Sequence, residues 1–223
     1  MLAADPALIA RWATAWATAW AISRHAAPPV ERHGGLYIHV DQPEQVGRYV
    51  VARPDAEPIR SIVAAIDRPL LYLKVCAAAD AVRPLLPSGW EIATPGYMMT
   101  APVPAMLGRP PVLPAEFSID ITKEGSIIYA HIIDAQDEEA ARGRIVLMDD
   151  LVIFDRIRTA EHYQRRGLGS AIMRSLAIEA DSRGVRDAML CATPAGRELY
   201  TALGWRLYSD YTTASLSAQA LPF

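Results

Sequence analysis

Apolar residues near the start of the chain recur at helical spacing. Trp12, Trp16 and Trp20 lie four positions apart, so a helix would place them on one face. A single aromatic face is typical of a helix that packs on a protein core, and an interfacial or oligomer contact is the alternative. Pro28 and Pro29 come next. Because proline disfavours helix continuation, we expect the helix to end before them.

Short apolar runs separated by polar turns fill the rest of the first hundred residues. They predict strands at 36–40, 49–51, 70–75 and 97–100, and helices at 59–66 and 77–86. Four prolines between positions 104 and 114 then argue against a helix or a central strand. We therefore expect an α+β subdomain over 1–102 and a proline-rich linker over 103–115.

The second half of the chain has a sharper pattern. Alternating apolar residues on either side of Glu124 and Gly125 predict a β-hairpin. The predicted elements are strands at 117–123, 127–133, 140–148, 151–159 and 188–191, helices at 170–182 and 194–203, and a strand or strand pair at 205–216. A strand meander that runs into strand–helix–strand–helix–strand predicts an α/β domain with a mixed α+β sheet over 116–223.

Composition narrows the class of protein. Of the 223 residues 52% are hydrophobic, and the net charge is −3. These values exclude a disordered chain and argue against duplex nucleic acid as the main partner. The longest apolar run, Trp12–Ile22, is too short to cross a bilayer. The first five residues, Met-Leu-Ala-Ala-Asp, also lack the positive charge that precedes the apolar stretch of a signal peptide. We therefore expect no membrane contact.

Cysteine and histidine usage argues against a disulfide framework and against a metal site. Cys76 and Cys191 are too few for a disulfide framework, and the five histidines are scattered without metal-ligand spacing. We expect a cytoplasmic protein without a bound metal.

The segment 164–170 carries the clearest chemical signal. It reads Gln-Arg-Arg-Gly-Leu-Gly-Ser and joins a predicted strand to a predicted helix. The first turn of a helix has unpaired N–H groups and a partial positive charge, and glycines let a phosphate approach the backbone. Arg165 and Arg166 add screening charge. An ordinary tight loop is the alternative. Two other phosphate motifs fail, because the Gly-Lys-Ser/Thr of a P-loop is missing and Ile172 replaces the third glycine of a dinucleotide fingerprint.

Two motifs in this half resemble the GNAT superfamily of acyl-CoA-dependent N-acyltransferases. Residues 164–169 match the pattern Gln/Arg-x-x-Gly-x-Gly/Ala, and residues 193–205 resemble the second landmark, which ends in Leu-Tyr-x-x-x-Gly-aromatic. One predicted helix and one predicted strand separate the two motifs, as in the family. The resemblance covers about residues 117–216 and implies a GNAT-like fold there, with acetyl-CoA as cosubstrate. The first hundred residues match no motif.

The resemblance implies a role for each matching position. Main-chain N–H groups of the glycine loop hold the CoA pyrophosphate, and the strand end at 157–159 pairs with pantetheine and donates an N–H to the thioester oxygen. Tyr200 protonates the departing thiolate, with a buried helix tyrosine as the alternative. Thr193 stands where the family often has asparagine. The residues implied in CoA binding are Ile157, Arg158, Thr159, Gln164, Arg165, Arg166, Gly167, Leu168, Gly169, Ser170 and Thr193.

An amine acceptor needs a base, because at an amine pKa near ~10 only ~0.1% of it is neutral at pH 7. Some family members place a glutamate on the fourth strand, but that position here is Ile153. Asp155 lies two residues further on and therefore on the same strand face, which makes it our candidate base, directly or through water. A solvent-exposed edge carboxylate, or pairing with Arg156 or Arg158, is the alternative.

These features favour an N-acyltransferase that moves an acetyl group from acetyl-CoA to a primary amine in a ternary complex. The acceptor would be a small molecule or a peptide. The alternative is a GNAT-fold protein that binds or senses acyl-CoA without turnover, which the missing glutamate and the unmatched N-terminal half favour. A homodimer through the tryptophan helix or through residues 208–216 is a further expectation.

Overall fold

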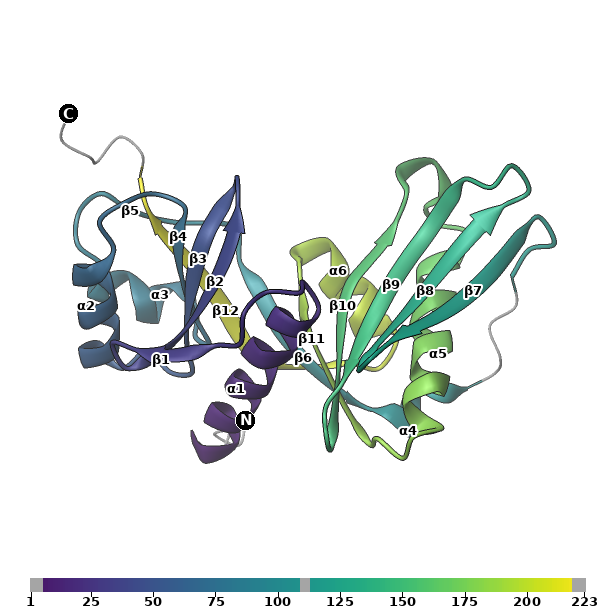
Figure 1. Cartoon of the computed structure of the whole chain (residues 1–223), viewed down its shortest axis with the longest axis horizontal. Helices are drawn as coiled ribbons and strands as arrows, with labels where there is room; N and C mark the ends of the chain where they lie inside the picture. The colour runs from purple at the N-terminus through teal and green to yellow at the C-terminus, as the bar shows by residue number, and fades with distance from the viewer. Residues whose placement is uncertain (1–5, 109–112, 218–223) are drawn as a thin grey trace. The chain divides into compact units, whose positions relative to one another are not determined.

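The computed structural model describes residues 6–108 and 113–217, which form two compact units (Figure 1). Unit 1 contains Met1–Met99, Cys191–Arg197 and Leu207–Phe223, and unit 2 contains Thr100–Leu190 and Glu198–Arg206. The chain therefore passes from one unit to the other within four elements. These are β6 (Gly96–Pro102), β11 (Asp187–Ala192), α6 (Pro194–Ala202) and β12 (Arg206–Leu216).

This division differs from the predicted boundary after residue 102, because both ends of the chain contribute to unit 1. A compact unit and a family domain need not coincide. The predicted extent of the acetyl-CoA-binding domain, 116–223, therefore stays a prediction.

Unit 1 is built on a small sheet. Three antiparallel strands come first, a helix follows, and the next strand runs parallel to the third. β12 then pairs antiparallel with that parallel strand and with a short strand. The elements are β1 (Val30–Arg32), β2 (Gly35–Gln42), β3 (Gln45–Val51), α2 (Ala56–Ala65), β4 (Leu71–Val75), α3 (Ala79–Val82), the 3-10 turn η1 (Arg83–Leu85) and β5 (Trp90–Ile92). The short strands β1 and β5 were not predicted.

The tryptophan helix α1 (Pro6–Ile22) packs on β2 and β3 of unit 1. Trp16 and Trp20 are 4% and 5% exposed, and the Arg48 guanidinium lies 3.5 Å from the ring centre of Trp20. The ring of Trp12 contacts that of Tyr208 in a tilted arrangement, with 4.6 Å between ring centres. The predicted core packing of this helix is confirmed. α2 packs with the other part of the core, where Ile59 and Ile62 lie among residues of β3 and β4.

Lys74 on β4 is a partly buried lysine of unit 1. Its ammonium group donates a hydrogen bond of 2.8 Å to Oγ1 of Thr213 on β12. Burial, reinforced by the Arg48 guanidinium and opposed by Cys191, lowers the pKa of Lys74 to about 7. The pKa of a lysine in an unfolded chain is ~10.4. Between these two values the unfolded state binds more protons than the folded state, so the free energy of unfolding rises with pH across this range.

We expect Lys74→Met to flatten this dependence, because a thioether carries no charge to bury. The variant should melt at a higher temperature than the wild type at pH 7, and the two melting temperatures should approach each other towards pH 10. Melting followed by circular dichroism at several pH values measures this. Lys123→Met is the matched control, since Lys123 is half exposed and pairs with Glu179. Parallel pH profiles for the Lys74→Met variant and the wild type would show that Lys74 keeps its ordinary pKa.

Unit 2 repeats the same order of elements on a larger scale. Four strands form an antiparallel meander, a helix follows, and β11 runs parallel to the last strand of the meander. The elements are β7 (Phe117–Glu124), β8 (Ile127–Asp134), β9 (Glu139–Leu147), β10 (Leu151–Thr159), the 3-10 turn η2 (Glu161–Tyr163) and α5 (Leu168–Asp181). The predicted hairpin, the two following strands, the helix and the short strand are confirmed.

The helix α5 covers one face of the meander (Figure 1). Its apolar residues Ile172 and Leu176 are fully buried. Gly143 on β9 makes this close approach possible, because a Cβ at that position would lie only 2.7 Å from Cγ2 of Ile172. The opposite face of the meander carries polar side chains, since neighbouring residues of a strand point to opposite faces.

The predicted linker contains a helix that the prolines were expected to exclude. α4 (Val103–Leu107) has Pro104 in its first turn, where a missing N–H breaks no helical hydrogen bond. The N–H of Val103 donates to the carbonyl of Arg186 at 2.8 Å. Residues 109–112 of the linker, and the first five residues used in the signal-peptide argument, lie outside the described part of the chain. Residues 206–216 form one strand and not a pair.

Of the helices within residues 6–108 and 113–217, none is long and apolar enough to span a membrane. The same residues contain no group of three or more histidine, cysteine or acidic side chains that could hold a metal ion.

Candidate active site

The strands β10 and β11 separate part of the way along their length. β10 has nine residues, but its parallel ladder with β11 joins only Leu151, Val152 and Ile153. On its other side β10 stays paired with β9 as far as Thr159. The described ladder with β11 therefore stops at Ile153, and β10 continues for six residues beyond it. In unit 1 the equivalent pair, β3 and β4, is joined at five positions from Gly47 to Val51.

A β-bulge occurs in β10 at this opening. The register with β9 shifts between Asp155 and Arg158, and Arg156 within the bulge has a φ of 52°. A bulge adds a residue to one strand and changes the direction in which the neighbouring side chains and N–H groups point. The predicted strand end at 157–159 thus lies directly after an irregular segment of β10.

The glycine loop ends at the first turn of α5, two residues earlier than predicted. Gly167 is the N-cap residue with a φ of 81°, and no side chain caps the helix. Since the first helical hydrogen bond runs from the N–H of Ala171 to the carbonyl of Gly167 at 3.0 Å, the preceding N–H groups have no partner within the helix. A Cβ on Gly169 would lie 3.4 Å from Oγ1 of Thr159. The helix start and the open end of β10 are therefore neighbours.

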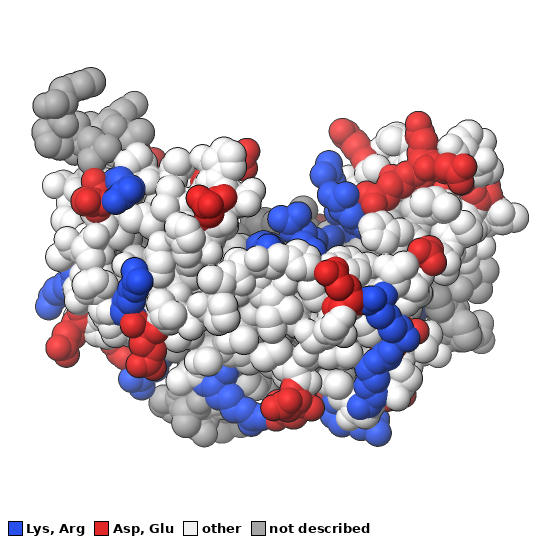
Figure 2. Space-filling model, in the orientation of Figure 1, with Lys and Arg blue, Asp and Glu red and all other residues white. Residues whose placement is uncertain are grey.

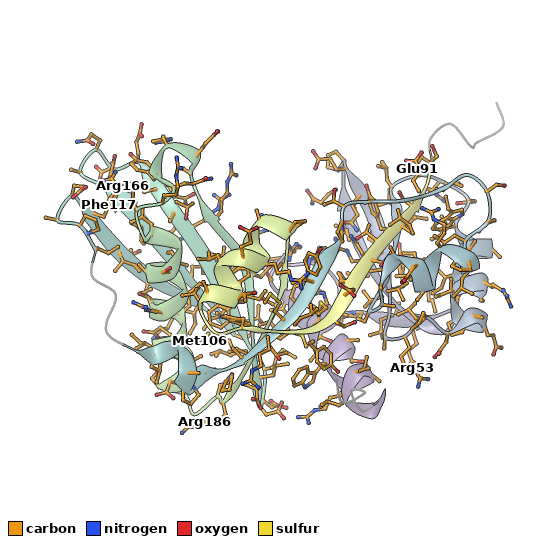
Figure 3. All side chains as sticks on the ribbon, turned by 180° about the vertical axis from the view of Figure 1, so that it is seen from behind. Arg53, Glu91, Met106, Phe117, Arg166 and Arg186 are labelled. Atoms are coloured by element: carbon orange, nitrogen blue, oxygen red, sulfur yellow. The ribbon has the colours of Figure 1, made fainter. Side chains whose placement is uncertain are left out.

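The loop before α5 is held at two points. Arg166 forms an ion pair with Glu116, and its guanidinium lies 4.7 Å from the ring centre of Phe117 at the start of β7 (Figure 3). Arg166 is thus already paired with a carboxylate, whereas Arg165 is exposed, and its predicted role in screening a bound anion stays a prediction. The N–H of Arg166 remains a predicted contact of the pyrophosphate.

Tyr163 provides the second point. Its hydroxyl donates a hydrogen bond to Asp134, at the acidic turn between β8 and β9 (Figure 2). This hydrogen bond is the main reason that the pKa of Tyr163 is raised to about 12 and that of Asp134 is lowered. The loop conformation is therefore fixed by side chains outside the loop itself, which preorganises the N–H groups at the helix start.

The corresponding turn of unit 1 is unsuited to an anion. Asp55 is the N-cap residue of α2, and Glu57 lies in the first turn. Arg53 is paired with Asp55 at 2.9 Å. Two carboxylates occupy the positive end of this helix, so the phosphate-binding turn predicted from the sequence has no counterpart in unit 1.

Tyr200 is 8% exposed and lies on α6. Its ring centre is 6.0 Å from that of Trp205, and Trp205 contacts Phe154 of β10 edge-on at 5.5 Å. Tyr200 is therefore connected by aromatic packing to the strand that opens. Thr193 caps the same helix, since its Oγ1 accepts a hydrogen bond of 3.1 Å from the N–H of Gly196. Of the predicted site residues, Thr193 alone belongs to unit 1.

Asp155 is buried, with only 9% of its side chain exposed. The alternative of a solvent-exposed carboxylate is therefore wrong, and its cationic neighbour is neither Arg156 nor Arg158. Oδ2 of Asp155 lies 3.9 Å from Nε of Arg144, which faces it across the pair of strands β9 and β10. The roles of Asp155 and Tyr200 in catalysis stay predictions.

The polar face of the meander contains a group of arginines that the sequence reading missed. A cavity of about 250 Å³ lies on it, and none of the described residues that line it carries a carboxylate. The lining residues are Tyr129, His131, Arg142, Gly143, Arg144 and Arg156. The signal was present, because Arg142 and Arg144 alternate with small and apolar residues within a predicted strand and must share a face. We call this space and its lining the arginine cavity.

Comparison with known proteins identifies the fold. No family model matches the sequence, and no curated protein is detectably similar. Among solved structures, a GCN5-related N-acetyltransferase from Kribbella flavida superposes with a TM-score of 0.65 at 17% identity, covering 93% of this chain and 95% of its own. A tandem GNAT protein from the clavulanic acid biosynthesis pathway gives 0.59 at 12% identity, with 97% of both chains covered. A GNAT-family protein from Novosphingobium aromaticivorans gives 0.56 at 14% identity, with 95% and 97% covered.

The chain has a GNAT-like α+β fold. The similarity is not restricted to the C-terminal half, where the sequence motifs lie, because it extends over 93% or more of this chain in all three comparisons. Residues 1–102 are thus part of the shared architecture although they match no motif.

Proposed function

We propose that this protein is an N-acyltransferase that transfers an acetyl group from acetyl-CoA to a primary amine. The observation that carries the proposal is the opening of β10 away from β11 beside a helix start with a glycine N-cap. An extended thioester needs both features at once, because its pyrophosphate requires N–H donors and its pantetheine arm requires a strand with free main-chain groups.

In this proposal the N–H groups at the start of α5 hold the pyrophosphate, and the main chain at 157–159 holds the pantetheine arm and the thioester oxygen. The neutral amine attacks the thioester carbon, a C–N bond forms, and the C–S bond breaks. Tyr200 gives its proton to the departing thiolate, and Asp155 or a water next to it takes the proton that the amine loses. A main-chain N–H directed at the thioester oxygen stabilises the negative charge that develops there.

Titration with acetyl-CoA tests whether the protein binds the proposed cosubstrate. We expect saturable heat in calorimetry and a rise in melting temperature, because a ligand that binds only the folded state stabilises it. Desulfo-CoA, which keeps the phosphates and cannot transfer, should give the same thermal shift. If millimolar acetyl-CoA gives neither heat nor a thermal shift, the proposal is wrong.

Release of free thiol in the presence of a panel of amines tests whether the protein transfers the acetyl group. A second candidate function is acyl-CoA sensing without turnover, which is favoured by Ile153 standing where some GNAT enzymes have glutamate and by the position of Asp155 opposite Arg144. Both functions require acetyl-CoA binding, but only the transferase releases thiol faster in the presence of an acceptor amine.

A further inference from the structure

We propose that the arginine cavity binds an oxyanion group, carboxylate or phosphate, of a small acceptor amine. This inference rests on the proposed function, because it names the class of acceptor that would receive the acetyl group. The cavity lies on the sheet face of unit 2 opposite α5, so it is distinct from the predicted pyrophosphate site at the start of that helix.

The charge of the lining is the first argument. Three guanidinium groups, those of Arg142, Arg144 and Arg156, surround a space of about 250 Å³ into which no lining residue brings a carboxylate. Planar guanidinium groups suit the two oxygens of a carboxylate or phosphate, which they bind in a bidentate manner. The volume holds a small anionic group and little more, and three cations would repel a polyamine.

The nearby carboxylates leave this charge only partly compensated. Glu139 is shared, because its two oxygens lie 2.9 Å from Nη1 of Arg142 and 2.9 Å from Nδ1 of His131. Asp155 is 3.9 Å from Arg144, beyond hydrogen-bond distance. Arg156 forms no ion pair with any residue in the part of the chain that the structure describes.

Arg144 provides an independent argument. Only 13% of its side chain is exposed, and its Nε is buried without a hydrogen-bond partner. A buried donor that lacks a partner destabilises the folded protein, because it has lost its hydrogen bond to water. Its guanidinium also lies 5.8 Å from the ring centre of Tyr129, another lining residue. A ligand oxygen in the cavity would supply the acceptor that this donor lacks.

The backbone of Arg156 gives a third argument. Its φ of 52° lies in the left-handed region, which is strained for a residue that has a side chain. Strained residues of this kind are concentrated at binding sites, and a bulge re-aims the side chain it carries. Here the bulge brings Arg156 into the lining of the cavity. The same bulge begins at Asp155, two residues after Ile153, the last residue of β10 in the ladder with β11. An amine whose anionic end is held by the arginines would therefore have its nitrogen close to the predicted base.

Paired probes test this assignment. β-Alanine and β-alaninamide have the same length and the same primary amine, and they differ in the negative charge. Their binding to the full chain is measured by calorimetry in the presence of desulfo-CoA. We expect β-alanine to bind at least tenfold more tightly than its amide. Phosphoethanolamine and ethanolamine form a second pair, which tells whether phosphate or carboxylate is preferred.

Arg156→Gln removes the charge and retains most of the side-chain length. We expect this variant to weaken binding of the preferred anionic probe at least tenfold and to change binding of the uncharged probe less than twofold. Arg186→Gln is the matched control, because Arg186 is a surface arginine of unit 2 paired with Asp181. It should leave both affinities unchanged.

The two proposals fail in different ways. Equal binding of the charged and uncharged probes, or equal weakening of both by Arg156→Gln, overturns the oxyanion site even if acetyl-CoA binds and thiol is released. Absence of acetyl-CoA binding with a retained preference for the charged probe overturns the proposed function and leaves the oxyanion site standing. In the thiol-release assay the same preference should appear as a lower KM for the anionic amine.

Discussion

Gly169→Asp is expected to lower the affinity for acetyl-CoA by on the order of 10²-fold or more, which corresponds to several kcal/mol. The side chain would extend from the first turn of α5, where the N–H groups face the predicted pyrophosphate, and its carboxylate would repel the phosphates. Calorimetric titration of the variant and the wild type measures the effect.

The fold itself should tolerate this change. A Cβ at position 169 would lie 3.4 Å from Oγ1 of Thr159 and 3.6 Å from Cδ2 of Leu199, which are ordinary contacts. An acidic residue in the first turn also interacts favourably with the helix dipole by ~0.3–1 kcal/mol. The melting temperature of the free protein should therefore stay the same or rise while the affinity falls.

Gly169→Ala is the matched control for charge. It adds the Cβ without the carboxylate, so a loss of affinity much smaller than that of the aspartate variant is expected. If both variants bind acetyl-CoA as the wild type does, the pyrophosphate is held elsewhere. If both lose affinity equally, steric exclusion at position 169 explains the effect and the charge does not.

The secondary structure of unit 2 could be predicted because its local signals agree. Alternating apolar residues give the strands, Gly125 allows the tight turn between β7 and β8, and the apolar face of α5 has helical spacing. Unit 1 was predicted less well because β1 and β5 have only three residues each. Strands of that length are determined by their pairing partners and leave no periodicity in the sequence.

The repeated order of elements in the two units had no signal in the sequence. Two antiparallel meanders, each followed by a helix and a parallel strand, can be built from unrelated residues because topology constrains only the apolar pattern. The helix starts show this difference, since α2 begins at Asp55 and α5 at Gly167. The set of segments that make up unit 1 could not be predicted either, because β12, which follows β4 by more than a hundred residues, pairs with it.

The two parts of the candidate site also differed in how far the sequence could predict them. The glycine loop was found because its residues are consecutive and its chemistry depends on the backbone. The partners of its side chains were not, because Arg166 pairs with Glu116, fifty positions away. The arginine cavity also needed the structure, since Arg156 joins Arg142 and Arg144 only through the bulge in β10.

Tyr200→Phe is expected to reduce the rate of acetyl transfer on the order of 10²-fold or more and to leave acetyl-CoA binding unchanged. The substitution removes a hydroxyl and keeps the ring, so the packing of Tyr200 against Trp205 is retained. General-acid catalysis by a positioned side chain contributes roughly 10²–10⁴-fold to a rate. A group that acts only on the departing thiolate should lower kcat and kcat/KM by the same factor.

Binding by calorimetry and transfer by thiol release are measured on the same preparations. Tyr37→Phe serves as the control. Tyr37 lies on β2 of unit 1, and the hydrogen bond described for its hydroxyl is a long, exposed one of 3.4 Å to His39. If Tyr200→Phe transfers at the wild-type rate, the thiolate takes its proton from water and the assignment of the acid is wrong. If the variant loses both binding and transfer and melts at a lower temperature, Tyr200 is a core residue whose hydroxyl supports the fold. A rate that falls at all pH values while binding and melting temperature stay constant is the result that only a proton donor explains.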